Sequence, residues 1–143
     1  MRRLRDSIAV NCPIDQAQTR IEEFFAGRRG IDGKVRLALP DHEVCIDARA
    51  GRDAQNLNDL VRVSWKAETD LPLPAFAGTL VTWGQGNPTL TFIELDGTYV
   101  PLGEIFDEPL GRRIAQRTAK DLLAQIAAAI ADTPAAQGYP SPL

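Results

Sequence analysis

The 143-residue chain contains one histidine and two cysteines, and this scarcity removes several classes of site. Two cysteines are too few for a disulfide framework, and Cys12 and Cys45 lack the C-x-x-C spacing of zinc and redox motifs. We expect both to be buried free thiols. His42 alone cannot form a His-rich metal site, and a Ser-His-Asp triad would depend on it entirely. We therefore expect no metal, no cofactor and no catalytic residue.

Long apolar runs and a strong net charge are also missing. No apolar run approaches the roughly 20 residues that cross a bilayer. The basic residues 1–6 lead into an alternating segment, which is not typical of a signal peptide. A net charge of −3 gives no basic surface for nucleic acid, so we expect the small arginine clusters to be solvated. The chain is expected to be cytoplasmic, with no membrane span and no nucleic-acid partner.

The composition is that of an ordinary globular domain, with 44% hydrophobic and 24% charged residues. A chain of this length forms one core without staples. We expect a single domain over residues 1–133. Residues 134–143 are rich in proline and poor in large apolar groups, which predicts a flexible tail.

The first third of the chain predicts a strand followed by a helix. Residues 4–10 can form a strand, and Pro13 suits the first turn of a helix with Asn11 or Cys12 as its cap. Gly27 ends this helix. One helical face carries five regularly spaced apolar residues, namely Ile14, Ala17, Ile21, Phe24 and Phe25.

Beyond Gly33 the apolar residues recur at every second position, which is the period of a strand. Residues 34–48 predict a hairpin that turns at Pro40 and Asp41. Residues 49–58 lack an apolar rhythm and predict an exposed loop. In the strand that follows, alternate positions are apolar, which predicts one buried and one solvated face; its buried set is Val61, Val63, Trp65 and Ala67.

The second half predicts two more strands and a long helix. The prolines of residues 71–74 predict a bend or edge segment. Residues 76–83 and 89–100 predict strands joined by a hairpin turn at 84–88. A G-x-G phosphate loop is rejected there because a strand follows instead of a helix. Asp107, Glu108 and Pro109 predict the start of a helix of about five turns, which ends at Pro134.

Four short motifs support a resemblance to a known superfamily. Residues 76–80 have the form F-x-G-x-L, and residues 93–99 resemble L-x-L-x-G-x-Y. Residues 101–103 read P-L-G, and residues 111–115 have the form G-x-R-I-A. Together with the element order, they resemble small bacterial members of the START-like (SRPBCC) superfamily, which includes birch-pollen-allergen-like proteins, lipid-transfer domains and polyketide cyclases/dehydratases. The resemblance covers residues 1–133.

The resemblance implies an α+β helix-grip fold. In that fold a curved antiparallel sheet, here of about six to seven strands, wraps around a long C-terminal helix, and a short N-terminal helix closes one end. Only residues 28–32 remain for a second helix, so the end wall of the expected cavity is reduced. The last helix carries small residues on its apolar side, including Ala115, Thr118 and Ala119, so it either approaches the sheet closely or leaves space. The resemblance favours a cavity.

We expect side chains from the sheet and the last helix to line this cavity, with Trp65 facing inward alongside Val61 and Val63. Simple core packing is the alternative for every aromatic residue among them. Glu94 can equally lie on a solvated outer face, and Phe106 can cover a pocket mouth or staple the helix start. The candidate ligand-binding residues are Trp65, Phe76, Leu80, Trp83, Phe92, Glu94, Tyr99, Phe106, Thr118 and Leu122.

The leading functional hypothesis is a non-enzymatic binding or carrier protein for a small hydrophobic molecule such as a lipid. A second hypothesis is a cyclase- or dehydratase-like enzyme for a polyketide-type or other apolar substrate. It requires an inward acid or base, and the candidates are Glu94, Asp47, His42 and Arg62. A third is a protein-interaction module or homodimer that pairs an exposed strand edge and holds no ligand.

Overall fold

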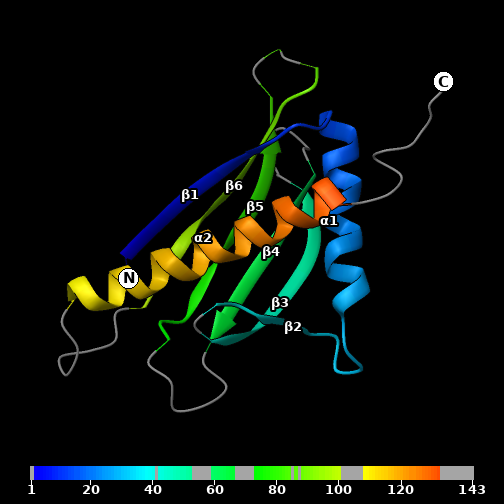
Figure 1. Cartoon of the computed structure of the whole chain (residues 1–143). Coiled ribbons are helices and arrows are strands. Elements are labelled where there is room, and N and C mark those ends of the chain that lie inside the picture. The colour runs from blue at the N-terminus through cyan, green and yellow to red at the C-terminus, as the bar shows by residue number, and fades with distance from the viewer. Residues whose placement is uncertain are drawn as a thin grey trace.

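A computed structural model of the chain describes residues 2–40, 42–52, 59–66, 73–84, 86, 88–100 and 108–132. These residues form one six-stranded antiparallel sheet and two helices (Figure 1). The strand order is β1-β6-β5-β4-β3-β2. The elements are β1 (Arg2–Val10), α1 (Ile14–Arg28), β2 (Val35–Ala38), β3 (Glu43–Arg52), β4 (Asp59–Lys66), β5 (Phe76–Trp83), β6 (Thr91–Tyr99) and α2 (Glu108–Asp132).

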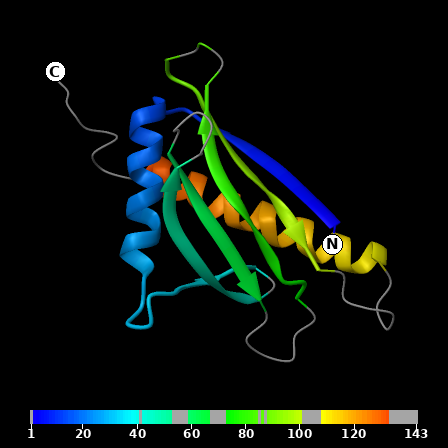
Figure 2. The ribbon, with the colours of Figure 1, turned by 180° about the vertical axis from the view of Figure 1, so that it is seen from behind.

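The helix α2 runs diagonally across one face of the curved sheet (Figure 1). Seen from behind, the strands lie in front of α2 and α1 stands at the side nearest β2 and β3 (Figure 2). The predicted α+β helix-grip arrangement is confirmed, with six strands. Residues 29–34 form a turn that ends in a bridge between Arg29 and Val35, so the short connection expected after α1 is also present.

The strand register assigns each sheet residue to one of two faces. We call the face toward α2 the inner face and the opposite one the outer face. Buried residues alternate along β6, with Ile93, Leu95 and Tyr99 on the inner face. This alternation follows the period-two rule for strands. The inner face and the helices share one core, to which α2 contributes Ala115, Thr118, Ala119, Leu122, Leu123, Ile126 and Ile130.

The start of α1 differs from the prediction. Pro13 occupies the N-cap position, and no side chain caps the helix, so neither Asn11 nor Cys12 has the capping role. The Pro13 carbonyl instead accepts a hydrogen bond from the amide of Ala17, 2.9 Å away. Ile14 lies in the first turn and is 37% exposed. The other four predicted apolar residues of α1 are buried.

The loop predicted at residues 49–58 is wrong at its start, because β3 continues to Arg52. Residues 49–52 pair with β4 from Arg62 back to Asp59, and Arg52 forms an ion pair with Asp59 at 3.3 Å. Backbone hydrogen bonds between β3 and β4 and the ion pair therefore extend the hairpin, although residues 49–52 lack an alternation of apolar and polar side chains. The last strand, β6, begins at Thr91, two residues later than predicted. Residues 53–58, Ala67, Phe106 and the predicted tail at 134–143 lie outside the described residues.

Of the two edge strands of the sheet, one is short and the other carries charged side chains. The strands at the two ends of the order are β1 and β2, and β2 has only four residues. The start of β1 carries three exposed arginines, Arg2, Arg3 and Arg5. Short and charged edge strands disfavour edge-to-edge pairing with another chain. The homodimer hypothesis therefore has no support from these edges and stays a prediction.

Candidate functional site

A row of buried side chains crosses the inner face at the end of the sheet where the chain leaves β4 and β6. Strand pairing places Ile46, Trp65, Phe76 and Tyr99 directly side by side on neighbouring strands. Three of these four residues are aromatic, and we call the set of four the aromatic row. Trp65 and Phe76 stack with ring centroids 4.4 Å apart and planes inclined by 22°. All four residues are 0–3% exposed.

Two glycines next to the aromatic row explain why Phe76 can lie flat on the sheet. Gly78 and Gly97 are paired across β5 and β6. A Cβ on Gly78 would lie 2.8 Å from Cζ of Phe76, and a Cβ on Gly97 would lie 2.7 Å from it. Neither residue can carry a side chain without displacing the ring. The glycines of the F-x-G-x-L and L-x-L-x-G-x-Y motifs therefore have a packing role. Sequence reasoning missed this role, although both motifs include the glycine.

Trp65 carries the polar group that distinguishes this row from ordinary core. Its indole Nε1 is buried and finds no acceptor among the described residues. Buried indole N–H groups usually have a hydrogen-bond partner. A buried donor left without one costs about 1–3 kcal/mol. An acceptor supplied from elsewhere would recover that free energy.

On the other side of the interior, α2 presents Thr118 and Leu122, which are 1% and 0% exposed. The Thr118 hydroxyl donates a hydrogen bond to the Ile114 carbonyl at 2.9 Å, and its Oγ1 lies 3.4 Å from Nε2 of His42. Nearby, the Gln125 amide donates to the Ala38 carbonyl at 2.5 Å. These two contacts fasten the connection between β2 and β3 to α2, and we call them the clasp.

The interior between the described sheet residues and α2 is closed. Leu80, on the inner face of β5, is 2% exposed, and the small residues Ala115 and Ala119 of α2 are 0–1% exposed. A void that admitted water would leave these side chains more exposed. The small residues of α2 therefore allow the helix to approach the sheet closely, and they do not leave a space between the two. Hollows lie elsewhere in the described structure. One of about 20 Å³ lies between α1 and strands β4 and β5, and one of about 470 Å³ lies where β1 leads into α1, beside the end of α2. A third, of about 650 Å³, runs along outer-face residues of β2, β3 and β4, and its lining also includes Trp65 and Ala75.

Three predicted ligand-binding residues lie on the outer face and cannot line the space beneath α2. Trp83 pairs with Phe92 across β5 and β6, and their rings stack with centroids 4.6 Å apart. Trp83 is 36% exposed. Glu94 pairs with Ser7 of β1 and forms an ion pair with Arg5 at 3.6 Å. The other predicted residues, Trp65, Phe76, Leu80, Tyr99, Thr118 and Leu122, are buried in the core.

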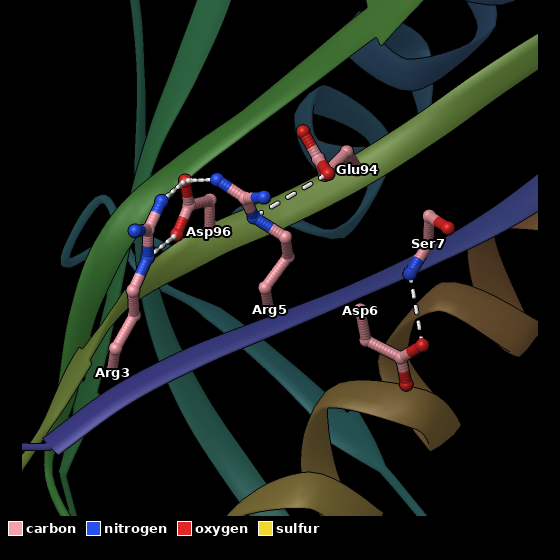
Figure 3. A network of polar contacts seen from close by, with 6 residues as sticks. All are labelled: Arg3, Arg5, Asp6, Ser7, Glu94 and Asp96. Atoms are coloured by element: carbon pink, nitrogen blue, oxygen red, sulfur yellow. Dashed lines mark hydrogen bonds and ion pairs between the residues drawn. The ribbon is translucent and has the colours of Figure 1, made fainter.

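The outer face beside Glu94 carries a network of charges (Figure 3). Arg3 and Arg5 both donate hydrogen bonds to Asp96, at 3.0 and 3.2 Å from its Oδ2. The hydrogen bond from Arg3 is the largest effect and lowers the pKa of the Asp96 carboxyl below its usual value; burial opposes it, and the hydrogen bond from Arg5 adds a smaller lowering effect. Asp6 points to the other side of β1 (Figure 3). The outer face beside Glu94 is therefore a solvated surface.

Of the four candidate acids and bases of the enzyme hypothesis, His42 is the one that the described contacts place beside α2. Asp47 lies on the outer face and pairs with Arg49 at 3.1 Å. Arg62 is exposed on the same face. The described residues contain no group of three or more His, Cys, Asp or Glu side chains that could hold a metal ion. Cys12 is a buried free thiol as predicted, and burial raises its pKa, whereas Cys45 is only half-buried.

No protein-family model matches the sequence, and no curated protein sequence matches it. Solved structures do match the fold. The protein XoxI from Bacillus cereus matches with a TM-score of 0.65 at 15% identity, over 92% of this chain and 97% of that one. A Streptomyces aromatase/cyclase, Zhui, matches with a TM-score of 0.56 at 11% identity, over 91% and 93% of the two chains.

A START superfamily protein from Mycobacterium smegmatis also matches, with a TM-score of 0.53 at 12% identity, over 88% of this chain and 97% of that one. At these identities the likeness establishes architecture and leaves activity open. The chain shares the fold of these structures, in which an antiparallel sheet wraps around a long C-terminal helix. Among the described residues, no helix is long and apolar enough to span a membrane.

Proposed function

We propose that the protein binds or carries a small hydrophobic molecule between the aromatic row and α2. The observation that carries this proposal is the buried row itself, in which stacked Trp65 and Phe76 leave one N–H donor without an acceptor. The START-like fold supports it, because aromatase/cyclase and START proteins share this architecture. The aromatic rings offer a large apolar contact surface to a guest.

The closed packing sets a condition on how a guest enters. Ligand pockets typically have volumes of about 300–1,000 Å³. The hollow of about 650 Å³ that Trp65 lines runs along outer-face residues of β2, β3 and β4. On the inner face, the side chains of the aromatic row are 0–3% exposed, so the described residues leave no such space beneath α2. Binding therefore requires α2 and the sheet to separate locally. The clasp at His42 and Gln125 contains the polar contacts that such a movement would break, each a net contribution of about 1 kcal/mol.

Native mass spectrometry of freshly purified protein tests the proposal most directly. We expect a mass above that of the chain alone, and denaturing extraction should release a small apolar molecule. Added apolar compounds should also raise the unfolding temperature in proportion to the logarithm of their concentration. A protein with no co-purifying molecule and no stabilisation by any apolar compound would contradict the proposal.

A cyclase- or dehydratase-like activity is the second candidate, favoured by the likeness to the Zhui aromatase/cyclase and by His42. His42 is the one candidate acid or base beside α2, with Nε2 3.4 Å from Oγ1 of Thr118. A general acid or base contributes about 10²–10⁴-fold to a rate. If a reaction is found, His42→Gln should reduce kcat by at least a hundredfold. An unchanged kcat would leave this candidate without a catalytic group among the four residues.

A further inference from the structure

We propose that the outer face of the sheet carries a second binding site, for a phosphate monoester group, formed by Lys34, Ser64 and Lys66. All three residues line the hollow of about 650 Å³ that runs along β2, β3 and β4. We call it the outer hollow, and it lies on the face of the sheet that is turned away from α2 (Figure 2). Its volume is within the range of about 300–1,000 Å³ that is typical of ligand pockets. The site is independent of the guest proposed above, which lies on the inner face.

The strand register brings these three groups to one place. Lys66 pairs with Cys45 across β4 and β3, and Ser64 pairs with Asp47 in a neighbouring row. Lys34 directly precedes β2, and continuing the pairing of β2 with β3 places it opposite Asp47. Lys34 therefore lies on one side of β3, while Ser64 and Lys66 lie on the other side, about 10 Å away, which is two strand spacings. Lysine side chains are long and flexible, so both ammonium groups can reach one anion above β3.

The two carboxylates in the outer hollow are already held by arginines. Arg36 donates two hydrogen bonds to Asp32, at 3.3 and 2.8 Å. These hydrogen bonds, followed by one from a backbone amide, lower the pKa of the Asp32 carboxyl to about 2. Asp47 forms an ion pair with Arg49 at 3.1 Å. Each carboxylate therefore has its own arginine, and the charges of the two pairs largely cancel.

Lys34 and Lys66 are not paired in this way. Among the described residues, neither lysine forms an ion pair or a side-chain hydrogen bond, and the Ser64 hydroxyl has no hydrogen-bond partner. A phosphate monoester has a charge of about −1.5 to −2 at pH 7 and three strong acceptor oxygens. Two ammonium groups and one hydroxyl donor match both its charge and its oxygens. A carboxylate has a single charge and two oxygens, so it would leave one lysine without a negative partner.

The turn beside the outer hollow indicates two sources for such a phosphate. Ile31 in this turn is fully exposed, at 110%, and the next residue, Asp32, lines the hollow. An exposed apolar side chain next to cations suits a membrane surface, where it can enter the acyl region while lysines contact anionic headgroups. The phosphate monoester can therefore belong to a soluble molecule or to the headgroup of a lipid such as phosphatidic acid, and the test separates the two.

The three lysines of the chain supply a test with an internal control. Lys34 and Lys66 line the outer hollow, whereas Lys120 is exposed on α2. Selective ¹³C labelling of the lysine ε-carbons gives one NMR signal for each, and the three lysine-to-glutamine variants assign them. We expect methyl phosphate to shift the signals of Lys34 and Lys66 and to leave that of Lys120 in place. Dimethyl phosphate and acetate, which carry a single charge, should bind at least threefold more weakly.

Substitutions measure the contribution of each group. Lys34→Gln and Lys66→Gln should each weaken methyl phosphate binding by about three- to fivefold, as expected for an exposed ion pair. Ser64→Ala should weaken it by about two- to threefold, because it removes one hydrogen-bond donor. Lys66→Arg keeps the charge and should stay within twofold of the wild type, and Lys120→Gln should leave the affinity unchanged. The lysine variants should unfold at the wild-type temperature, which shows that the fold is intact.

Vesicles distinguish a lipid headgroup from a soluble phosphate. With a lipid source, the protein should co-sediment with phosphatidylcholine vesicles that contain phosphatidic acid and not with pure phosphatidylcholine vesicles. Ile31→Ser should then weaken vesicle binding and leave the affinity for methyl phosphate unchanged. With a soluble source, methyl phosphate should bind and neither kind of vesicle should. Methyl phosphate binding is expected in both cases.

The proposal is overturned if methyl phosphate shifts no lysine signal, or if it shifts the signal of Lys120 as much as those of Lys34 and Lys66. Equal affinities for acetate and methyl phosphate would also overturn it. None of these results bears on the apolar guest, because the outer hollow and the space proposed for that guest lie on opposite faces of the sheet.

Discussion

The sheet carries two tryptophan-phenylalanine stacks that differ in little except the face on which they lie. Trp65 and Phe76 stack at 4.4 Å on the inner face, and Trp83 and Phe92 stack at 4.6 Å on the outer face. The first pair is 3% exposed, whereas Trp83 is 36% exposed. The same two residue types thus form a core element in one place and a solvated surface pair in the other.

The difference shows that residue type alone does not indicate a binding site. The outer stack can satisfy its indole N–H with solvent, while the inner stack has no such access. The inner stack also depends on two glycines that let Phe76 approach the backbone. Burial, close approach and an unpaired donor coincide only at the inner pair, and this coincidence makes it the candidate site.

The largest expected difference between the two stacks is in stability. Trp65→Ala should reduce the free energy of unfolding by about 3–5 kcal/mol, because a fully buried aromatic side chain leaves a cavity. Trp83→Ala should reduce it by about 1 kcal/mol or less, since its ring is partly solvated already. Equilibrium urea unfolding followed by far-UV circular dichroism measures both. Equal losses would mean that the two faces are not distinct in solution.

The glycine support of the inner stack gives the next largest effect. A Cβ at residue 97 would clash with the Ala77 carbonyl oxygen, so Gly97→Ala forces a backbone shift. We expect a loss of about 1–3 kcal/mol, as for other overpacked sites. The control is Gly27→Ala in α1, where nothing lies within 4 Å of the new methyl group. The same urea titration should show no loss for the control; a Gly97 variant as stable as wild type would contradict the close approach.

A smaller effect is expected from the clasp. Thr118→Val removes the hydroxyl that donates to the Ile114 carbonyl and faces His42, at a cost of about 1 kcal/mol. Thr79→Val makes the same substitution on the outer face of β5 and should change stability by less than about 0.5 kcal/mol. Amide hydrogen exchange should also become faster at Ala38 and Leu39 in the Thr118 variant alone. Identical behaviour of the two variants would argue against the clasp.

The smallest effect concerns the outer face and its pH dependence. Because the pKa of Asp96 in the folded state lies below its usual value of 3.8, its ionised form favours the folded state. This stabilisation is complete above that value and is lost as pH falls through the folded pKa. Asp96→Asn should therefore reduce stability at pH 6 by less than about 1 kcal/mol. The difference should shrink in urea titrations as the pH falls through the folded pKa of Asp96, whereas a gap independent of pH would exclude this linkage.

The alternation and amphipathic periods of the sequence predicted almost every element and the inward position of Trp65. They could not assign the facing of Phe76, Trp83, Phe92 or Tyr99. In β6 the apolar residues occupy both alternating sets, since Phe92 and Leu95 lie on opposite faces. Only the register between β5 and β6, which depends on contacts across the sheet, separates them.

The unpaired donor and the clasp were beyond prediction for a related reason. Whether Nε1 of Trp65 meets an acceptor depends on the side chains that fold around it, and their spacing along the chain does not show this. The contact between His42 and Thr118 joins residues 76 positions apart. The glycines of the two motifs could have been recognised, because each lies two positions from an aromatic residue of the same strand face.

The placement of β1 has a kinetic consequence. Among the described strands it pairs with β6 alone, and the hydrogen bond from Arg3 to Asp96 spans 93 positions of chain. During synthesis β1 emerges from the ribosome long before that partner exists, so it must wait in an unpaired state. Pairings of such high contact order are slow to form. Although β1 is translated well before β6, it is therefore among the last elements to reach its native position, and chaperone contact during this delay would fall on its exposed arginines and alternating apolar residues.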